Sequence, residues 1–183
     1  MSVLVDRDVF NAVESGAIVI RPFERRHLGT NSYDVHLAPV LRVYQRYVGG
    51  IRPLDARADN PTRDVEVPDV GYVLSPGELY LASTVEYTES HVHLPILNGK
   101  SSLGRLGLSV HVTAGTGDVG FRGHWTLELT IVRPLRIYAG MAVGQLLWFE
   151  ASGVPEVPYD EKPGAKYRDA GPLPQASRMH EER

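Results

Sequence analysis

The chain has 183 residues and a formal net charge of -3 at pH 7, with 43% hydrophobic and 22% charged residues. These values are typical of one globular domain with its own core, and they argue against a broad basic surface for nucleic acid. The chain has no cysteine, which excludes disulfides and thiolate metal sites. Residues 1–8 are too few and too charged for a signal peptide, and no apolar run is long enough to span a membrane. We therefore expect a cytoplasmic protein that binds neither nucleic acid nor membranes.

The first half of the sequence contains one helical pattern followed by several strand patterns. Residues 6–15 fit a short helix that Asp6 caps, with Val9, Phe10 and Val13 on one face. Short strands are then expected at residues 17–20, 32–37, 41–48, 72–74, 79–85 and 94–97. Residues 49–70 are rich in Gly, Pro, Asp and Arg, and we expect a long loop there.

The clearest strand pattern of the second half lies at residues 124–130. Polar and apolar residues alternate through it, so that Glu128 lies on the face opposite Trp125 and Leu127. Further strands are expected at residues 109–113, 135–138 and 143–149. Residues 151–183 are rich in proline, glycine and charge, and should form a tail with few core residues. The sequence thus predicts one mainly β domain at residues 1–150, a jelly-roll-like or distorted barrel with one or a few short helices.

A glycine-flanked loop at residues 99–105 (Gly-Lys-Ser-Ser-Leu-Gly-Arg) carries the most informative chemistry. It brings two cations and two hydroxyls together, which suits a polyphosphate. Two carboxylates follow, Asp118 and Glu128, and the second lies in the predicted strand. A carboxylate held in a strand suits positioned proton transfer. Together these features predict an enzyme that acts on a nucleotide.

Several familiar motifs do not fit this chain. Residues 115–120 (Gly-Thr-Gly-Asp-Val-Gly) have the spacing of the dinucleotide fingerprint, but a strand follows where that fingerprint needs a helix. Residues 99–101 lack the first glycine of a P-loop, because Leu94 stands at its position. A zinc deaminase site is excluded because it needs cysteine ligands. His91 and His93 are better interpreted as exposed polar residues than as metal ligands.

The stretch from Gly99 to Glu128 resembles the dCTP deaminase family, part of the dUTPase-like superfamily. The matching segments are residues 99–108, 113–115, 118, 120–121, 123 and 126–129, with further matches at 31–37, 140–141, 144–146, 159 and 165–167. The resemblance implies a dUTPase-like β fold and a homotrimer whose active sites are shared between subunits. It implies a deoxynucleoside triphosphate as ligand, closed over by the tail. Magnesium would bind through the substrate phosphates, with no protein metal site and no zinc.

By this resemblance, Glu128 is the general base that activates water for attack on C4 of cytosine. Ser101 and the carbonyl of Ala114 hold that water, and the charge of Arg105 keeps the carboxylate ionised. Substrate contacts are implied at Lys100, Ser101, Ser102, Leu103, Gly104, Arg105, Asp118, Thr126, Leu127, Glu128, Gln145, Tyr159, Lys166 and Ala170. Ala170 stands in place of a family glutamine, whose contact with the base is therefore lost or moved to Gln175.

The products remain open at this point because Asp118 is present. In dUTPases the aspartate of this block orients water for attack on the α-phosphate. Here Thr116 and Gly117 replace a bulkier pair, and Val119 stands where proline is common. The leading hypothesis is deamination of dCTP to dUTP and ammonia. The alternatives are a bifunctional enzyme that forms dUMP, a dUTP diphosphatase, and a non-catalytic nucleotide-binding trimer.

Overall fold

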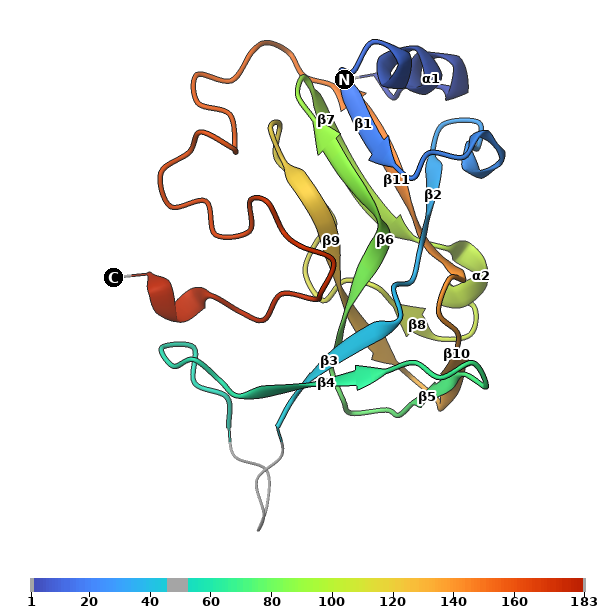
Figure 1. The fold of residues 1–183 in the computed structure, drawn as a ribbon, viewed down its shortest axis with the longest axis vertical. Coiled ribbons are helices and arrows are strands. Elements are labelled where there is room, and N and C mark those ends of the chain that lie inside the picture. Colours follow the sequence, from blue (N-terminus) through green and yellow to red (C-terminus); the bar gives the residue numbers. More distant parts are fainter. Residues whose placement is uncertain (1, 46–52, 183) are drawn as a thin grey trace.

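The computed structural model describes residues 2–45 and 53–182, and its architecture is mainly β (Figure 1). The strands are β1 Ile18–Arg21, β2 Tyr33–His36, β3 Val40–Tyr44, β4 Thr62–Glu66, β5 Tyr72–Leu74, β6 Tyr80–Ser90, β7 His93–Gly99, β8 Leu108–Ser109, β9 Arg122–Ile131, β10 Leu135–Ile137 and β11 Ala142–Glu150. The helices are α1 Asp6–Glu14, α2 Ser101–Gly104 and the 3-10 turns Arg25–His27 and Met179–Glu181. These short strands and helices confirm the predicted fold class.

The strands form two larger sheets and one small pair. The larger sheet has the order β4-β3-β6-β9-β8, with β1 paired to β6, and the second has the order β2-β11-β7. The small pair joins β10 to β5. Pairing is antiparallel throughout these strands. Inward-facing side chains of both larger sheets belong to one hydrophobic core, so the sheets hold each other in place.

The alternation predicted for residues 124–130 is confirmed in β9. Trp125, Leu127 and Leu129 are buried in the core, whereas Thr126 and Glu128 are only half-buried on the opposite face. This arrangement follows from the two-residue period of a strand. Burial of the apolar face therefore fixes which way Glu128 projects.

Four local expectations are wrong. Residues 101–104, expected within a glycine-flanked loop, form the short helix α2. The loop expected at residues 49–70 contains β4, which pairs with β3; its exposed charged residues Arg63 and Asp64 are typical of an edge strand. The strand expected at residues 109–113 ends at Ser109, and Val112 is exposed beyond it. Asp6 does not cap α1, because Val5 is the N-cap and makes no side-chain capping bond. Residues 46–48, expected to end a strand, lie outside the described residues.

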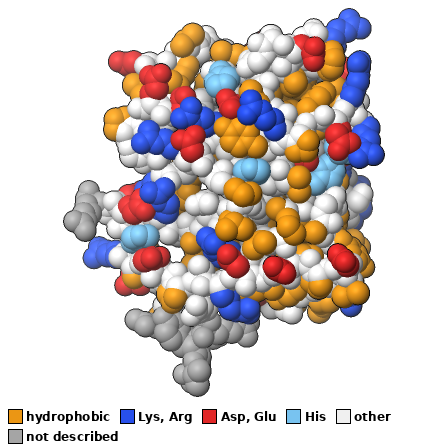
Figure 2. Space-filling view, viewed as in Figure 1, with side chains coloured by type: hydrophobic (Ala, Val, Ile, Leu, Met, Phe, Trp, Pro, Cys, Tyr) orange, Lys and Arg blue, Asp and Glu red, His pale blue; other side chains and the backbone are white. Residues whose placement is uncertain are grey.

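The surface carries charges of both signs. Figure 2 shows acidic and basic side chains interspersed with apolar ones on the face that it draws. Within the described ranges, none of the helices has the length and apolar character needed to cross a membrane.

Candidate active site

The carboxylate of Glu128 is fixed by backbone groups. The amide N–H of Val112 donates a hydrogen bond to Glu128 Oε2 at 2.8 Å. The amide N–H of Glu128 itself donates to the carbonyl of Val110 at 2.9 Å, and on the other side β9 pairs Glu128 with Leu81 of β6. The side chain is therefore held between a neighbouring strand and the segment after β8, which limits its freedom before any ligand arrives.

Buried hydroxyls anchor the strand that carries Glu128. Thr84 Oγ1 accepts the amide N–H of Trp125 at 3.0 Å, and the indole N–H of Trp125 donates to Thr88 Oγ1 at 2.9 Å. The register of β6 against β9 shifts between Ser83 and Tyr87, so Thr84 lies at an irregularity in the sheet. Because these polar groups are buried and satisfied, they specify the position of β9 beneath Glu128.

Glu128 lines a cavity of about 380 Å³, a size that suits a small ligand. The other residues around it come from β9, from the segment after β8, from β3 and β6, and from the tail. They are Tyr44, Leu79, Leu81, His111, Ala114, Gly115, Phe121, His124, Trp125, Thr126, Tyr167, Ala170, Gln175, Ala176 and Ser177. An acidic group with fixed geometry thus faces a largely apolar space of ligand size.

His111 adds a second titratable group to this cavity. Burial lowers the pKa of His111, while the charge of Glu128 and the hydrogen bond to the carbonyl of Leu97 act in the opposite direction. His111 Nε2 lies 3.1 Å from that carbonyl oxygen, so Nε2 carries the proton of the neutral ring. A neutral imidazole therefore lies beside the Glu128 carboxylate near neutral pH.

The turn that presents Ala114 to the cavity requires a glycine at position 115. The carbonyl of Gly115 accepts the amide N–H of Leu97 at 2.7 Å. A Cβ at Gly115 would lie 1.8 Å from the carbonyl oxygen of Leu97 and 2.6 Å from His111 Nε2. Only glycine permits this approach. The glycine-rich run at residues 115–120 is thus a close-packed turn followed by β9, as predicted.

The tail runs beside β9 (Figure 1), and several of its residues line this cavity. His124 donates its amide N–H to the carbonyl of Ala170 at 2.9 Å, and Gly123 forms a parallel bridge with Ala170. Further along, the amide N–H of Gln175 donates to Thr126 Oγ1 at 3.0 Å. Ala170 and Gln175 both line the cavity, so the segment between them spans the face that carries Glu128.

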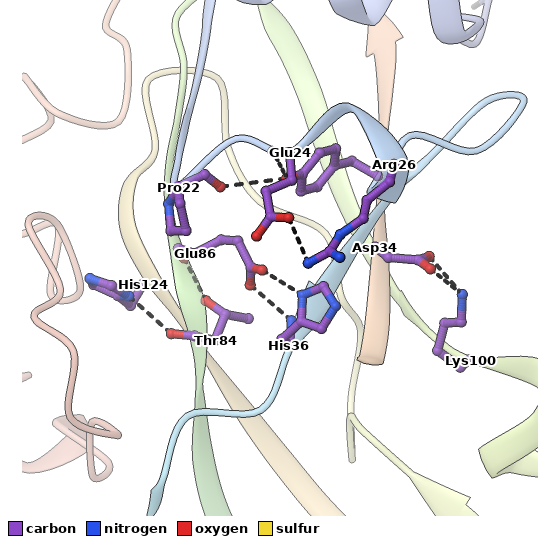
Figure 3. Close-up of polar contacts among 10 residues, drawn as sticks. Pro22, Glu24, Arg26, Asp34, His36, Thr84, Glu86, Lys100 and His124 are labelled. Carbon is purple, nitrogen blue, oxygen red and sulfur yellow. Dashed lines mark hydrogen bonds and ion pairs between the residues drawn. The ribbon is translucent and has the colours of Figure 1, made fainter. Parts of the chain in front are cut away.

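A second group of polar side chains lies on the sheet β2-β11-β7. Lys100 Nζ lies 2.6 and 2.7 Å from the two carboxylate oxygens of Asp34 (Figure 3). Gln145 of β11 is in register with Asp34 of β2 and with Asn98 of β7, so these side chains share one face. The resulting patch combines a cation, a carboxylate and amides. Its chemistry suits phosphate oxygens and a hydrated cation.

The residues predicted from the sequence do not all come together in one place. Among the described residues, Glu128, Ala114, Thr126 and Ala170 line the cavity, but Ser101 and Arg105 do not. The remaining predicted residues lie elsewhere. Ser101, Ser102, Gly104, Arg105 and Asp118 are exposed, Leu103 and Leu127 are buried, Lys100 and Gln145 lie on the second sheet, and Tyr159 and Lys166 lie in the tail.

Two tail residues predicted to touch the ligand are engaged within the tail. Tyr159 accepts the amide N–H of Tyr167 on its hydroxyl at 3.1 Å, and Lys166 forms an ion pair with Glu182. Sequence reasoning assigned no role to His111, Tyr167 or Asp34. The alternating pattern of residues 32–37 placed Asp34 on a polar face, which was the available signal for it.

The chain belongs to the dCTP deaminase-like family, whose model matches residues 3–151. It is 42% identical over 151 residues to a dUMP-forming dCTP deaminase of Leptospira biflexa, covering 82% of this chain and 83% of the relative. It is 43% identical over 152 residues to the enzyme of the same description from Clostridium acetobutylicum, covering 83% of each chain. A third relative of that description, from Clostridium beijerinckii, is 37% identical over 167 residues, or 91% of each chain.

A solved structure has the same fold. The 2'-deoxycytidine 5'-triphosphate deaminase from Agrobacterium tumefaciens superposes with a TM-score of 0.63 at 20% identity. The match covers 81% of this chain and 48% of that longer chain, so the protein spans about half of its length. This similarity supports the dUTPase-like β architecture.

Proposed function

We propose that this protein deaminates dCTP and converts it to dUMP, with release of ammonia and diphosphate. The observation that carries this proposal is the Glu128 carboxylate, which Val112 fixes by one oxygen at the wall of a ligand-sized cavity. Within the described ranges, its other oxygen, Oε1, has no hydrogen-bond partner in the protein. That oxygen can accept a proton from a bound water.

Deamination proceeds by addition of water to C4 of the cytosine ring and loss of ammonia. Glu128 takes the proton from the attacking water and passes it to the departing nitrogen. The carbonyl of Ala114, beside the same cavity, accepts the second hydrogen of that water and orients it. Thr126 and the tail residue Gln175, joined by a hydrogen bond, form part of the wall of this space and would hold the ring beside Glu128.

The dUMP product distinguishes this proposal from the leading sequence-based hypothesis, which ended at dUTP. The three relatives described above carry the words dUMP-forming in their names, and their identity to this chain is 37–43%. Asp118, exposed in the turn between Ala114 and β9, is our candidate carboxylate for a second hydrolytic step at the α-phosphate. The bifunctional alternative is therefore favoured over deamination alone.

The active site requires a second copy of the chain, and a homotrimer meets that need. Ser101 and Arg105 are exposed and lie apart from the cavity that contains Glu128. The neighbouring surface is apolar: Leu106 and Val132 are 56% and 74% exposed, and Val132 packs against Gly107. Exposed apolar side chains of this size are typical of an interface. Packing of subunits here would bring Ser101 and Arg105 of one chain toward Glu128 of another.

Magnesium fits the Lys100 patch as part of the substrate. Mg²⁺ usually binds through phosphates and water with one or two carboxylates, and Asp34 provides one carboxylate beside Lys100 and Gln145. When bound with the nucleotide, the ion neutralises phosphate charge. Lys100 and Gln145 would hold the phosphate oxygens themselves, by a charged and a neutral hydrogen bond.

The test is to incubate the purified protein with dCTP and Mg²⁺ and to measure ammonia, diphosphate and nucleotide products together. We expect ammonia, diphosphate and dUMP in equal amounts, and a loss of all three in Glu128→Gln. Glu66→Gln is the matched control, because Glu66 is an exposed strand glutamate on β4. Ammonia with dUTP but no diphosphate would restore the deaminase-only hypothesis. Nucleotide binding without any product would support the non-catalytic alternative.

A further inference from the structure

A cluster of two histidines and one glutamate lies outside the site described above. His27, His36 and Glu86 each offer one ligand atom, and these atoms all lie within 4.8 Å of one another. The three residues come from the 3-10 turn Arg25–His27, from β2 and from β6. Glu86 is almost fully buried, with 2% of its surface exposed, whereas both histidines are partly exposed. The cluster is thus a buried carboxylate beneath two accessible imidazoles.

The carboxylate of Glu86 orients one of these imidazoles (Figure 3). Glu86 Oε2 accepts the amide N–H of His36 at 2.8 Å, and Glu86 Oε1 lies 2.6 Å from His36 Nδ1. Nδ1 of His36 and Oε1 of Glu86 therefore face each other, and an ion that displaces the proton between them would meet both atoms, while Oε2 keeps its bond to the amide N–H of His36. The His27 ring lies 4.2 Å from the His36 ring, centroid to centroid. Neither ring nitrogen of His27 has a hydrogen-bond partner among the described residues.

The cations near this cluster are engaged elsewhere. Arg26 forms an ion pair with Glu24 at 2.7 Å, and the guanidinium of Arg25 lies over the ring of Phe10, 4.5 Å from its centroid. A positive ligand at the cluster would therefore not meet a free arginine from this turn. The carboxylate of Glu86 adds a negative charge that has little water around it, and such a charge is stabilised by a bound cation.

We propose that His27, His36 and Glu86 bind a divalent transition-metal ion of the zinc class. Two imidazoles and one carboxylate are a ligand set that Zn²⁺ uses, with water in the fourth position. Mg²⁺ and Ca²⁺ are disfavoured because they prefer oxygen ligands. A tetrahedral ion with bonds of about 2.0–2.2 Å holds its ligand atoms roughly 3.3–3.6 Å apart, which these side chains reach by small rotations.

The ion would act on stability and not on the deamination chemistry. It would tie the 3-10 turn and β2 to β6, three elements that otherwise meet here through the tilted contact of the His27 and His36 rings and the His36–Glu86 pair. His36 and Asp34 lie two residues apart on β2, so the same strand carries the carboxylate that holds Lys100. This site could not be predicted from the sequence, because its ligands are separated by nine and by fifty residues and form no known metal-binding motif.

The test uses the untagged chain, stripped of metal and free of nucleotide, with Zn²⁺ alone as the probe. We expect one Zn²⁺ per chain by calorimetry, and a rise of about 5–10 °C in Tm at a concentration near 100 times Kd. His27→Gln should weaken Zn²⁺ binding at least about tenfold and remove the rise in Tm. This variant should fold, because His27 is partly exposed and its side chain makes no hydrogen bond to the described residues.

The matched control is His91→Gln. His91 Nε2 lies 2.9 Å from Glu89 Oε2 and is 44% exposed, so it offers the same pair of residue types without a third ligand. This variant should bind Zn²⁺ as the wild type does. Visible absorption by bound Co²⁺, present in the wild type and absent in His27→Gln, would report the coordination independently of stability. Equal Zn²⁺ affinity in wild type and His27→Gln, or no stoichiometric binding by the wild type, would overturn the proposal.

Discussion

The Glu128 cavity and the segment at residues 100–105, which contains α2, contrast in how much of each is organised within one chain. Glu128 has its carboxylate bonded to Val112, its strand anchored by buried threonines, and a tail across its face. The segment at residues 101–105 is largely exposed, and its neighbour Lys100 is held by Asp34. One region is enclosed by its own chain, whereas the other presents its polar groups outward.

This difference separates two tasks of a nucleotide enzyme. A general base works only in one position, so it benefits from rigid support by the strand that carries it. A phosphate site needs positive charge, but the position of that charge can vary more than the position of a general base. Its lysine can therefore pair with an aspartate before the substrate binds. Ser101 and Arg105 are exposed, so they can assist a general base at Glu128 only if another chain brings them to the Glu128 cavity.

Glu128→Gln should lower the rate of ammonia release by about a hundredfold to ten-thousandfold. The amide oxygen of the glutamine can still accept the N–H of Val112, so the fold and the cavity should remain. Binding of dCTP, measured by calorimetry, should change little. If the variant releases ammonia at the wild-type rate, Glu128 does not take part in the reaction, and the two regions do not differ in the way described.

Mixing two inactive variants should restore activity if the site is shared between subunits. In Glu128→Gln the Ser101 region is intact, and in Ser101→Ala the Glu128 cavity is intact. When the two chains are unfolded and refolded together at equal amounts, about one quarter of the shared sites contain both wild-type residues. Ammonia release should then recover to about that fraction of the wild-type rate. No recovery, with mixed oligomers demonstrated by mass, would mean that each chain builds its own site.

Lys100→Met should raise KM for dCTP by about 10- to 100-fold, the cost of one hydrogen bond from a charged donor. The turnover rate should change less, because the lysine lies apart from the Glu128 cavity. Lys162→Met serves as the control, since Lys162 is an exposed lysine of the tail. Equal KM values for the two variants would show that the Lys100 patch does not bind the triphosphate.

Local patterns in the sequence predicted the strand that carries Glu128. The two-residue alternation around Trp125 and Leu127 determines the side of the sheet on which Glu128 lies, and it can be read from adjacent residues. The strand β4 was missed because its polar, charged residues match a loop in composition. Its extended conformation is stabilised by hydrogen bonds to β3, twenty-two residues away at the Arg42–Asp64 pair.

The sequence offered candidate site residues but not their arrangement. Glu128, Ala114 and Thr126 do line one cavity. The bond from Val112 to Glu128 depends on a chain reversal after β8, and the Asp34–Lys100 pair joins residues sixty-six positions apart. Such contacts depend on how the sheets pack, which no short motif encodes. Which subunit supplies Ser101 depends on an interface between chains and stays a prediction.

Gly123→Ala should loosen the tail from β9. Gly123 has φ of 142°, and a Cβ there would lie 2.7 Å from the backbone nitrogen of Ala170. Strain of this kind costs about 1–3 kcal/mol, and displacement of the tail relieves it. Trypsin should cleave at Lys166 and Arg168 faster than in the wild type. Gly153→Ala is the control in the same tail, because no atom lies within 4 Å of its added Cβ; equal cleavage of both variants would contradict the prediction.

The smallest expected effect is a pH dependence of stability that His111 contributes. Burial lowers the pKa of His111, so between that lowered value and about 6.5 the unfolded chain binds more protons than the folded one. His111 should therefore make its full contribution to the free energy of unfolding above about pH 6.5. This contribution should fall as the pH decreases below that value.

His111→Gln should flatten this dependence, because an amide can donate to the carbonyl of Leu97 without titrating. Part of the slope should remain, since burial also lowers the pKa of His93. Urea unfolding at several pH values between 5 and 7.5 measures both slopes. If His111→Gln keeps the wild-type slope and His93→Gln loses it, the proton uptake belongs to His93, and the imidazole beside Glu128 contributes nothing to the acid sensitivity of the cavity.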